Sequence, residues 1–355
     1  MERLEELAAW LPPRTAALVT SALSRRYLLG FPSEDGVLLV TGEESYFIID
    51  ARYYDDACRR IKGVRVTLLR DMRAQLLEIM VTHNVRNVLV EADRMTVREL
   101  AAYEEQFHYA QFDRSDALAD KLGQMRMIKS AQELRCICEA QRIADRAFSR
   151  VMSSVKRGMT EKQVAAAVNY CLLDEGSEGM AFPVMAASGE NSAHAHISPT
   201  DRTLRRGDFL VLDFGAVYGG YCSDMTRTLA VGAPTAEMEE AYNAVANAQN
   251  DALRAMAAGR GSKLADSVAR STLGAWGGLD RYFTHGLGHG VGLEVHEAPF
   301  ISQSSRSVLR AGMVVTAEPG VYITGRFGVR IEDMALVTEE GARVISHSTK
   351  KLLCV

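Results

Sequence analysis

The stretch THGLGHGVGLEVHEAP, residues 284–299, concentrates three histidines and four glycines in a short span. His289 lies in the middle, directly between Gly288 and Gly290. Glycine has no Cβ, so these neighbours would let other backbone segments approach the imidazole closely. Neutral imidazole is the commonest metal ligand among side chains. The stretch therefore predicts that His289 shares a metal with residues from elsewhere in the chain.

A phosphate-binding loop is the alternative interpretation of these glycines. The segment GLGHGVG, residues 286–292, alternates glycine with other residues and never gives G-x-G-x-x-G. No helical pattern follows it, although a nucleotide-binding loop opens a helix. We therefore do not expect phosphate binding here.

The surrounding sequence predicts helices and hairpins in its C-terminal part. Ser130, with Glu133 three residues later, is a capping-box signature at the start of a helical pattern. A second helix is predicted after Thr160 and a third over 235–259, with strand-like runs and glycine turns between and after them. Residues 15–70 carry short β-rich runs, and a helix and another strand follow. This alternation predicts a separate α/β domain at the N-terminus.

Two aspartates flank the first predicted hairpin. Asp213 lies in VLDFG and Asp224 in CSDMT, and Gly219-Gly220 forms the expected two-residue turn. This turn pairs Asp213 with residue 226, so Asp224 lies two places along the opposite strand, on the same face. Because FLVLDF, residues 209–214, is nearly all apolar, Asp213 is expected to be buried. A buried carboxylate needs a cation or several hydrogen bonds.

Two glutamates flank a second hairpin in the same way. Glu318 in TAEPG and Glu332 in VRIED lie in apolar surroundings, and a three-residue loop centred on Gly325 places them opposite each other. Pro319 lacks a backbone N–H, so the pairing beside Glu318 is expected to be irregular.

Four acids in apolar strands cannot all ionise unless positive charge is supplied. Arg227 and Arg330 are close in sequence but are too few. Divalent metal would balance the charge, with His289 as a fifth ligand. Four carboxylates and one imidazole suit two hard-to-borderline ions such as Mn²⁺, Co²⁺ or Fe²⁺, rather than a thiolate-type zinc site.

These motifs resemble the M24B proline-directed metallopeptidase family, which includes aminopeptidase P and prolidase. The stretch HGLGHGVGLEVHE is similar to the family signature at every position, and VLDFGAVYGGYCSDMTRT, TAEPGVYI and GVRIED resemble its other blocks. The segment GFPSEDGVLLVTGEESYFIIDARY resembles the creatinase-type N-terminal domain. The resemblance implies an α+β fold, with a small α/β creatinase-type domain over 1–122 and a pita-bread (creatinase/aminopeptidase-like) catalytic domain over 123–355.

The resemblance also implies two divalent ions per chain, with Mn²⁺ favoured and Co²⁺, Fe²⁺ or Zn²⁺ as alternatives. Asp224 and Glu332 would bridge the two ions, which would activate a water molecule as the nucleophile. The implied ligands are Asp213, Asp224, His289, Glu318 and Glu332.

Five side chains have implied catalytic roles. Glu318 would move a proton, while His285 and His296 would hydrogen-bond the substrate carbonyl and the tetrahedral intermediate. His196, in ASGENSAHAHISPTDR, aligns with a histidine near the scissile bond. Arg330 would orient an acid ligand or the substrate backbone, although a purely structural ion pair is an equal alternative.

The implied activity is hydrolysis of the Xaa-Pro bond at peptide N-termini. Archaeal-type prolidases carry an arginine shortly after the HE-x-P segment, where it can pair with a substrate carboxylate. Phe300 stands there in this chain, which favours an aminopeptidase that accepts longer peptides. Xaa-Pro dipeptidase (prolidase) is the alternative, because Arg306 or Arg326 could substitute. A creatinase-like amidinohydrolase and a non-catalytic binding relative are remote alternatives, since neither usually keeps the full ligand set.

Composition limits location and partners. The 355 residues are 47% hydrophobic and 24% charged, with 41 basic and 45 acidic side chains and a net charge of −4. No basic block points to nucleic acid, and no apolar run approaches the roughly 18 residues of a membrane helix. The N-terminus lacks a signal-peptide pattern, and the scattered cysteines fit reduced thiols. We expect a cytoplasmic enzyme acting on proline-containing peptides, and a homodimer because dimers are common in the resembling family.

Overall fold

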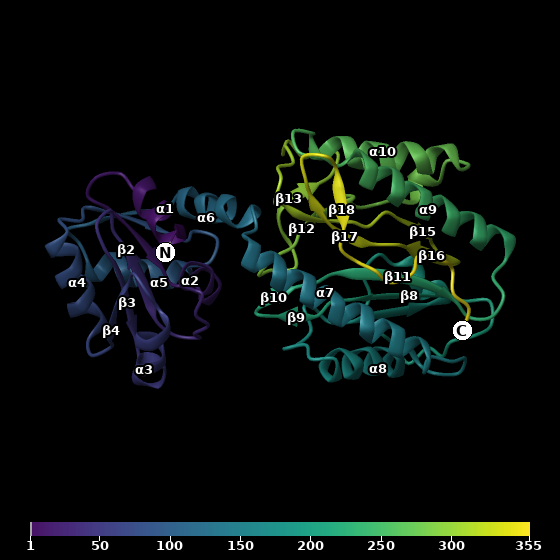
Figure 1. The fold of residues 1–355 in the computed structure, drawn as a ribbon, viewed down its shortest axis with the longest axis horizontal. Coiled ribbons are helices and arrows are strands. Elements are labelled where there is room, and N and C mark those ends of the chain that lie inside the picture. Colours follow the sequence, from purple (N-terminus) through teal and green to yellow (C-terminus); the bar gives the residue numbers. More distant parts are fainter. Residues whose placement is uncertain (1) are drawn as a thin grey trace. The chain divides into compact units, whose positions relative to one another are not determined.

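The computed structural model describes residues 2–355, and the chain divides into two compact units between Arg126 and Met127. We call the part up to Arg126 unit 1 and the part from Met127 onward unit 2 (Figure 1). Among residues 2–355, none of the helices is both long enough and apolar enough to span a bilayer.

Unit 1 is built on a six-stranded mixed sheet in the order β4-β3-β2-β1-β5-β6. β1–β2–β3 pair antiparallel, whereas β1–β5, β3–β4 and β5–β6 pair parallel. The strands are β1 (Thr15–Val19), β2 (Val37–Val40), β3 (Ser45–Ile49), β4 (Arg65–Leu68), β5 (Asn87–Val90) and β6 (Gln111–Asp113). The helices are α1 (Glu2–Trp10), α2 (Ala22–Leu29), α3 (Ala51–Arg60), α4 (Met72–Thr82), α5 (Val97–Gln106) and α6 (Ala117–Met127). This confirms the predicted α/β character of the N-terminal part.

Unit 2 has strands between two pairs of helices. α7 (Ala131–Met152) and α8 (Glu161–Asp174) lie on one side of the strands, and α9 (Ala236–Ala255) and α10 (Ser262–Ala275) lie on the other (Figure 1). Capping boxes at Ser130 and Thr160 begin α7 and α8. Both helix starts were predicted from these residues, whereas α10 was not predicted.

The pairings between the named strands of unit 2 are antiparallel, as its hairpin pattern predicted. The first strands are β7 (Met185–Ser188), β8 (Phe209–Phe214), β9 (Val217–Tyr218), β10 (Tyr221–Cys222) and β11 (Met225–Ala230). The later ones are β12 (Gly288–Gly290), β13 (Glu297–Ile301), β14 (Val314–Ala317), β15 (Gly320–Ile323), β16 (Phe327–Arg330), β17 (Asp333–Val337) and β18 (Ala342–Val344). Two short 3₁₀ helices are η1 (Gly189–Ala193) and η2 (Leu279–Tyr282).

The first hairpin has the predicted register. Asp213 in β8 pairs with Thr226 in β11, and Gly219 and Gly220 form the turn with φ of 58° and 78°. Positive φ at both turn residues is what a tight two-residue hairpin requires. Leu212 and Phe214 pack into the core beneath α7 and α8. Since strand side chains alternate, Asp213 projects from the opposite face.

The second hairpin keeps one register but is split between two sheets. Gly320 pairs with Arg330 in β15–β16, and Ala317 pairs with Asp333 in β14–β17. Glu318 and Glu332 lie between these ladders and are opposite each other, as predicted. The Glu318 N–H donates to the Leu287 carbonyl, and the Glu332 N–H donates to that of Thr226. The break beside Pro319 therefore lets each glutamate be held by a neighbouring strand.

Candidate metal centre

The structure brings the five predicted ligands together. Ligand atoms of Asp213, Asp224 and Glu332 lie within 4.8 Å of one another. Those of His289, Glu318 and Glu332 form a second such group, so Glu332 joins the two. His296, predicted to be catalytic rather than a ligand, forms a third group with Asp224 and His289.

The glycines beside His289 allow the close approach that the sequence predicted. A Cβ on Gly288 would lie 2.3 Å from the Thr316 carbonyl oxygen, and one on Gly290 would lie 2.3 Å from that of Ala298. Any larger side chain would therefore push β14 or β13 away. The His289 N–H donates to Thr316 Oγ1 at 3.1 Å, which fixes the backbone beside the imidazole.

Hydrogen bonding fixes the tautomer of His289. Its Nδ1 lies 3.0 Å from the Gly290 carbonyl oxygen, which can only accept, so Nδ1 carries the proton. Nε2 then faces Glu318 Oε1 at 3.3 Å and Asp224 Oδ2 at 3.5 Å. Burial opposes protonation of the ring, but the hydrogen bond and charge of Glu318 raise the pKa of His289 overall. A proton or a metal ion is required between this nitrogen and the carboxylates.

The carboxylates also require a cation. Burial, and then repulsion from neighbouring acids, raises the pKa of Asp224 and of Glu332 well above the usual range. Asp213 Oδ1 and Glu332 Oε1 are buried without a hydrogen-bond partner, although buried acceptors are nearly always satisfied. Two orphaned carboxylate oxygens in an acidic cluster with one imidazole fit divalent ions of the hard-to-borderline class.

Arg330 holds the outer oxygens of the acidic cluster. Its Nη2 donates to Asp213 Oδ2 at 2.6 Å, and its Nε donates to Thr226 Oγ1 at 3.0 Å. Thr226 Oγ1 in turn donates to Glu332 Oε2 at 2.7 Å. One oxygen of each acid is therefore bound, and the other is left to face the cluster. This geometry is compatible with both predicted options for Arg330, the orientation of an acid ligand and a structural ion pair.

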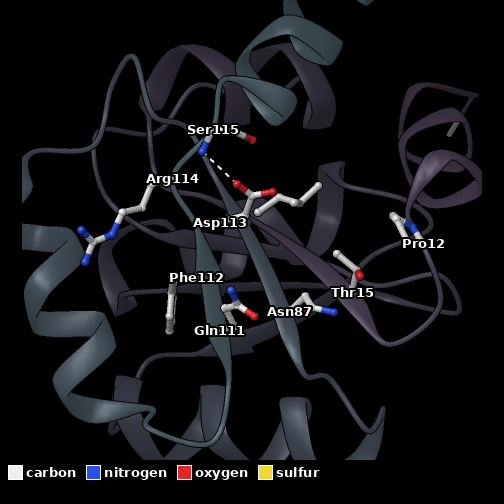
Figure 2. A pocket seen from close by; sticks show the side chains of 9 residues that line it. Pro12, Thr15, Asn87, Gln111, Phe112, Asp113, Arg114 and Ser115 are labelled. Carbon is white, nitrogen blue, oxygen red and sulfur yellow. Dashed lines mark hydrogen bonds between the residues drawn. The ribbon is translucent and has the colours of Figure 1, made fainter.

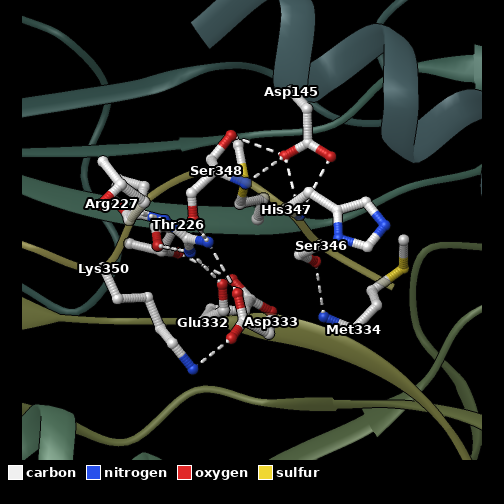
Figure 3. A network of polar contacts seen from close by, with 12 residues as sticks. Asp145, Thr226, Arg227, Glu332, Asp333, Met334, Ser346, His347, Ser348 and Lys350 are labelled. Atoms are coloured by element: carbon white, nitrogen blue, oxygen red, sulfur yellow. Dashed lines mark hydrogen bonds and ion pairs between the residues drawn. The ribbon is translucent and has the colours of Figure 1, made fainter. Parts of the chain in front are cut away.

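A second network lies behind Glu332. The adjacent Asp333 is 1% exposed, and Figure 3 shows its carboxylate between Arg227 and Lys350. Its oxygens lie 2.7 Å from Arg227 Nη2 and 2.8 Å from Lys350 Nζ. Although burial acts in the opposite direction, Arg227 and Lys350 lower the pKa of Asp333. Arg227 also donates to the Ser348 carbonyl, so the C-terminal segment supports the start of β17, directly after Glu332.

His285 has a hydrogen-bond partner at each of its ring nitrogens. Its Nδ1 lies 2.8 Å from the Gly286 carbonyl oxygen, and its Nε2 lies 2.9 Å from Tyr322 Oη. Arg330 Nη1 donates to Tyr322 Oη at 2.9 Å, so the phenol proton is directed to His285. Burial lowers the pKa of His285 and raises that of Tyr322 to about 12.

Tyr322 and Thr226 were not predicted as site residues. The hairpin register contains the signal for Tyr322, because it lies two residues from the partner of Arg330 on the same strand face. Thr226 follows from the predicted pairing opposite Asp213.

The two remaining predicted histidines are exposed. The His296 ring centroid lies 4.2 Å from that of His289. Partial burial, and then the charge of His289, lowers the pKa of His296, with a smaller contribution from His196. His296 therefore lies within electrostatic reach of the cluster, and His196 within reach of His296.

A cavity of about 580 Å³ opens beside the cluster, where His285, His289 and Glu318 form part of its wall. Phe300, which is 56% exposed, and four serines between residues 302 and 307 form another part. Among the described residues that line it there is no lysine or arginine. Arg326, one predicted substitute for a carboxylate-binding arginine, instead pairs with Glu237 at the surface.

A further hollow of about 700 Å³ lies in unit 1, where β1, β5 and β6 begin. Figure 2 shows its polar wall, in which the Ser115 N–H donates to Asp113 Oδ1 at 2.8 Å. None of the predicted site residues lines this hollow.

Comparison with known proteins defines the family. Residues 135–339 match the model of metallopeptidase family M24, and residues 13–128 match the creatinase/prolidase N-terminal domain. The chain belongs to metallopeptidase family M24. This result confirms the predicted family, the predicted fold class and the prediction of a metallopeptidase.

The similar proteins include both predicted specificities. The chain is 35% identical to an Xaa-Pro dipeptidase of Pyrococcus furiosus, over 99% of each chain. The structure of an Xaa-Pro dipeptidase from Bacillus anthracis is 35% identical with a TM-score of 0.93, covering 100% of this chain and 98% of the other. An X-Pro aminopeptidase from Thermotoga maritima is 34% identical with a TM-score of 0.90, covering 96% and 97%. These relatives support the dipeptidase alternative better than the aminopeptidase that Phe300 favoured.

Proposed function

We propose that this chain is a dinuclear metal-dependent exopeptidase that hydrolyses Xaa-Pro bonds, with Xaa-Pro dipeptides as its main substrates. The observation that carries the proposal is the pair of orphaned, buried oxygens on Asp213 and Glu332, set among two more carboxylates and His289. The dipeptidases among the similar proteins support the choice of substrate.

The proposed metal ligands are those predicted from the sequence, and Mn²⁺ is the proposed ion. Bound divalent ions would neutralise the carboxylates, polarise the substrate carbonyl and make water a stronger nucleophile. Asp224 and Glu332 would be the ligands shared by the two ions, since each belongs to two of the groups of neighbouring ligand atoms.

The other residues would handle protons and substrate. Glu318 lies beside His289 at the cavity wall, where it would take a proton and return it to the leaving proline nitrogen. His296 and His196 would donate hydrogen bonds to the substrate carbonyl, since both are exposed near the cluster. His285, whose pKa burial lowers and whose Nε2 lies 2.9 Å from Tyr322 Oη, would with His296 hydrogen-bond the substrate carbonyl and the tetrahedral intermediate.

Aminopeptidase activity on longer peptides is the second candidate. The observation that favours it is the cavity wall, which has hydroxyl groups and an aromatic ring but, among the described residues that line it, no lysine or arginine for a substrate carboxylate. Serine hydroxyls can donate to a carboxylate or to an amide, so the wall accommodates both substrate classes.

The test compares kcat/KM for Xaa-Pro, Xaa-Pro-NH₂ and Xaa-Pro-Xaa peptides after reconstitution with Mn²⁺. The dipeptidase proposal expects the free dipeptide to be preferred by about 10-fold or more, equivalent to about 1.4 kcal/mol. Equal or faster hydrolysis of the longer peptide would assign aminopeptidase activity instead. Absence of turnover with all three would count against both.

We also propose a cytoplasmic homodimer. The six cysteines are all free, which fits a reducing compartment. Dimers are common in the family, and sedimentation equilibrium of the purified chain tests this part directly.

A further inference from the structure

The loop that carries His196 is held by an unusual buried carboxylate. We call residues 189–199 the His196 loop; it leaves β7 at Ser188 and ends before Thr200. Only its first residues, Gly189–Ala193, form a 3₁₀ helix, and the rest is irregular. Irregular segments hold a side chain in place only when other residues fix their backbone.

Glu161, the first residue of α8, ties both ends of this loop together. Its side chain is 0% exposed. Oε1 accepts from Ser188 N at 2.7 Å and Ser188 Oγ at 2.8 Å, and Oε2 accepts from Thr200 N at 2.9 Å and Thr200 Oγ1 at 2.6 Å. Asn191 Nδ2 lies 3.1 Å from both oxygens. A single carboxylate therefore holds the start, the 3₁₀ turn and the end of the loop.

The chemistry of these partners requires a carboxylate. Each of them is an N–H or O–H donor, so both oxygens must accept. A glutamine at position 161 would place its NH₂ group against hydrogen-bond donors at one end of the loop, and that end would no longer be held. Arg202 donates to Ser188 Oγ at 2.8 Å and forms an ion pair with Asp208. Arg202 therefore supports the start of the loop, where Ser188 lies.

The far side of the His196 loop is attached to the strands of the metal centre. Arg330 Nη1 donates to the carbonyl of Ala195, the residue before His196, at 2.8 Å. The Gly328 N–H donates to Ser192 Oγ at 2.8 Å. Glu161 therefore holds the two ends of the loop, and β16 holds its middle. Together these contacts determine the position of His196.

We propose that Glu161 is a positioning residue, which places His196 at the substrate side of the acidic cluster by closing the loop that carries it. This inference rests on the peptidase function proposed above, in which His196 contacts the substrate. The hydrogen bonds of the Glu161 carboxylate go to Ser188, Asn191 and Thr200 and to none of the proposed metal ligands, so its effect on the site is expected to pass through the loop.

The first test measures loop order without using activity. Hydrogen exchange at the amides of residues 188–200 is compared in the full-length Mn²⁺-loaded wild type and Glu161→Gln. Exchange there is expected to accelerate about 10-fold or more, while exchange in α9 and affinity for Mn²⁺ stay unchanged. The matched control is Glu91→Gln in unit 1, where a buried glutamate accepts from Thr20 N, Ser21 N and Ser21 Oγ but holds no predicted site residue.

The second test asks whether the effect on catalysis passes through His196. For an Xaa-Pro dipeptide, kcat/KM of Glu161→Gln is expected to fall about 10- to 100-fold, as small displacements of positioning groups do. In the double variant with His196→Ala, the two losses should not add, because His196→Ala already removes what Glu161 positions. The Glu91→Gln control should leave kcat/KM unchanged.

Thr200→Val, which keeps the carboxylate and removes one donor from the end of the loop, provides a milder variant if Glu161→Gln does not fold. It should change exchange and kcat/KM in the same direction by a smaller factor. Additive losses in the double variant, or unchanged exchange at residues 188–200, would overturn the inference. A wild type that hydrolyses no Xaa-Pro substrate would refute the proposed function alone, and the exchange measurement would still decide whether Glu161 orders the loop.

Discussion

Replacing Asp224 by asparagine should stabilise the metal-free protein and destabilise the metal-loaded one. Asp224 is 4% exposed, and its carboxylate lies within 4.8 Å of ligand atoms of Asp213 and Glu332. Without a metal ion, Arg330 still pairs with Asp213 and His289 still lies beside Asp224, but the remaining charge of the acids leads to repulsion or proton uptake. Asparagine removes one charge from the cluster and keeps nearly the same volume.

The magnitude follows from the separation of the charges. Two unit charges about 4.8 Å apart repel by about 3.5 kcal/mol at an effective dielectric constant of about 20. Proton uptake relieves part of this repulsion, and the amide loses some hydrogen bonds on burial. We therefore expect a net gain of about 1–2 kcal/mol for metal-free Asp224→Asn at neutral pH.

The pH dependence of the metal-free protein follows from the raised pKa values of Asp224 and Glu332. A carboxyl whose pKa is raised by folding contributes stability that is present below its unfolded pKa of about 4 and is lost as pH rises through the folded value. The contribution of these two groups to the stability of the metal-free wild type should therefore fall as pH rises above about 4. Asp224→Asn should show a shallower decline, because one of these groups no longer titrates.

Metal should reverse the order of stabilities. At a free Mn²⁺ concentration of about 100 times Kd, binding adds about 2.7 kcal/mol to the wild type, whereas the variant lacks a proposed bridging ligand. Urea unfolding is followed by the fluorescence of Trp276 in a Trp10→Phe background, so that the signal comes from unit 2. If Asp224→Asn is less stable than wild type in chelator, the carboxylates do not repel one another as described.

Three further substitutions test other parts of the structure. Lys129→Met should lower the free energy of unfolding of unit 2, measured in urea, by about 3–5 kcal/mol. The variant loses the 2.7 Å ion pair between Lys129 Nζ and Glu297 Oε1, whose side chains are 1% and 6% exposed, while the Glu297 carboxylate stays buried. A cost below about 1 kcal/mol would show that the pair is not desolvated. Phe300→Arg should raise the preference for Xaa-Pro over Xaa-Pro-NH₂ by about 10-fold in kcat/KM, and an unchanged ratio would show that the cavity does not hold the substrate C-terminus. Asp333→Asn should weaken Mn²⁺ binding measured by calorimetry about 10- to 100-fold, because Arg227 would lose its carboxylate partner beside Glu332. Unchanged affinity would show that this network does not support the ligand.

The register of both hairpins could be predicted because turn residues fix it. Gly219 and Gly220 adopt the positive φ that a two-residue turn needs, and this alone sets the pairing of Asp213 with Thr226. Pro319 cannot donate, which predicted the irregular pairing that separates Glu318 from the ladder. The starts of helices with capping boxes, such as the one at Ser130, could also be predicted from the sequence.

Other features depend on contacts that local patterns do not encode. α10 begins at Ser262, and its N-cap residue Gly261 provides no side-chain hydrogen bond, so the helix carries no start signal. Arg330 reaches Asp213 and the carbonyl of Ala195, partners more than a hundred residues away in sequence. Glu161 looks like an ordinary acidic residue in the first turn of a helix, and only the folded loop reveals that it is buried.

The proposed dinuclear centre can be tested most directly by anomalous diffraction at the manganese edge from crystals grown with Mn²⁺. Two peaks are expected, both within coordination distance of the carboxylates of Asp224 and Glu332, with His289 Nε2 bound to one of them. Peaks located elsewhere, or none between these side chains, would contradict the assignment of these residues as metal ligands.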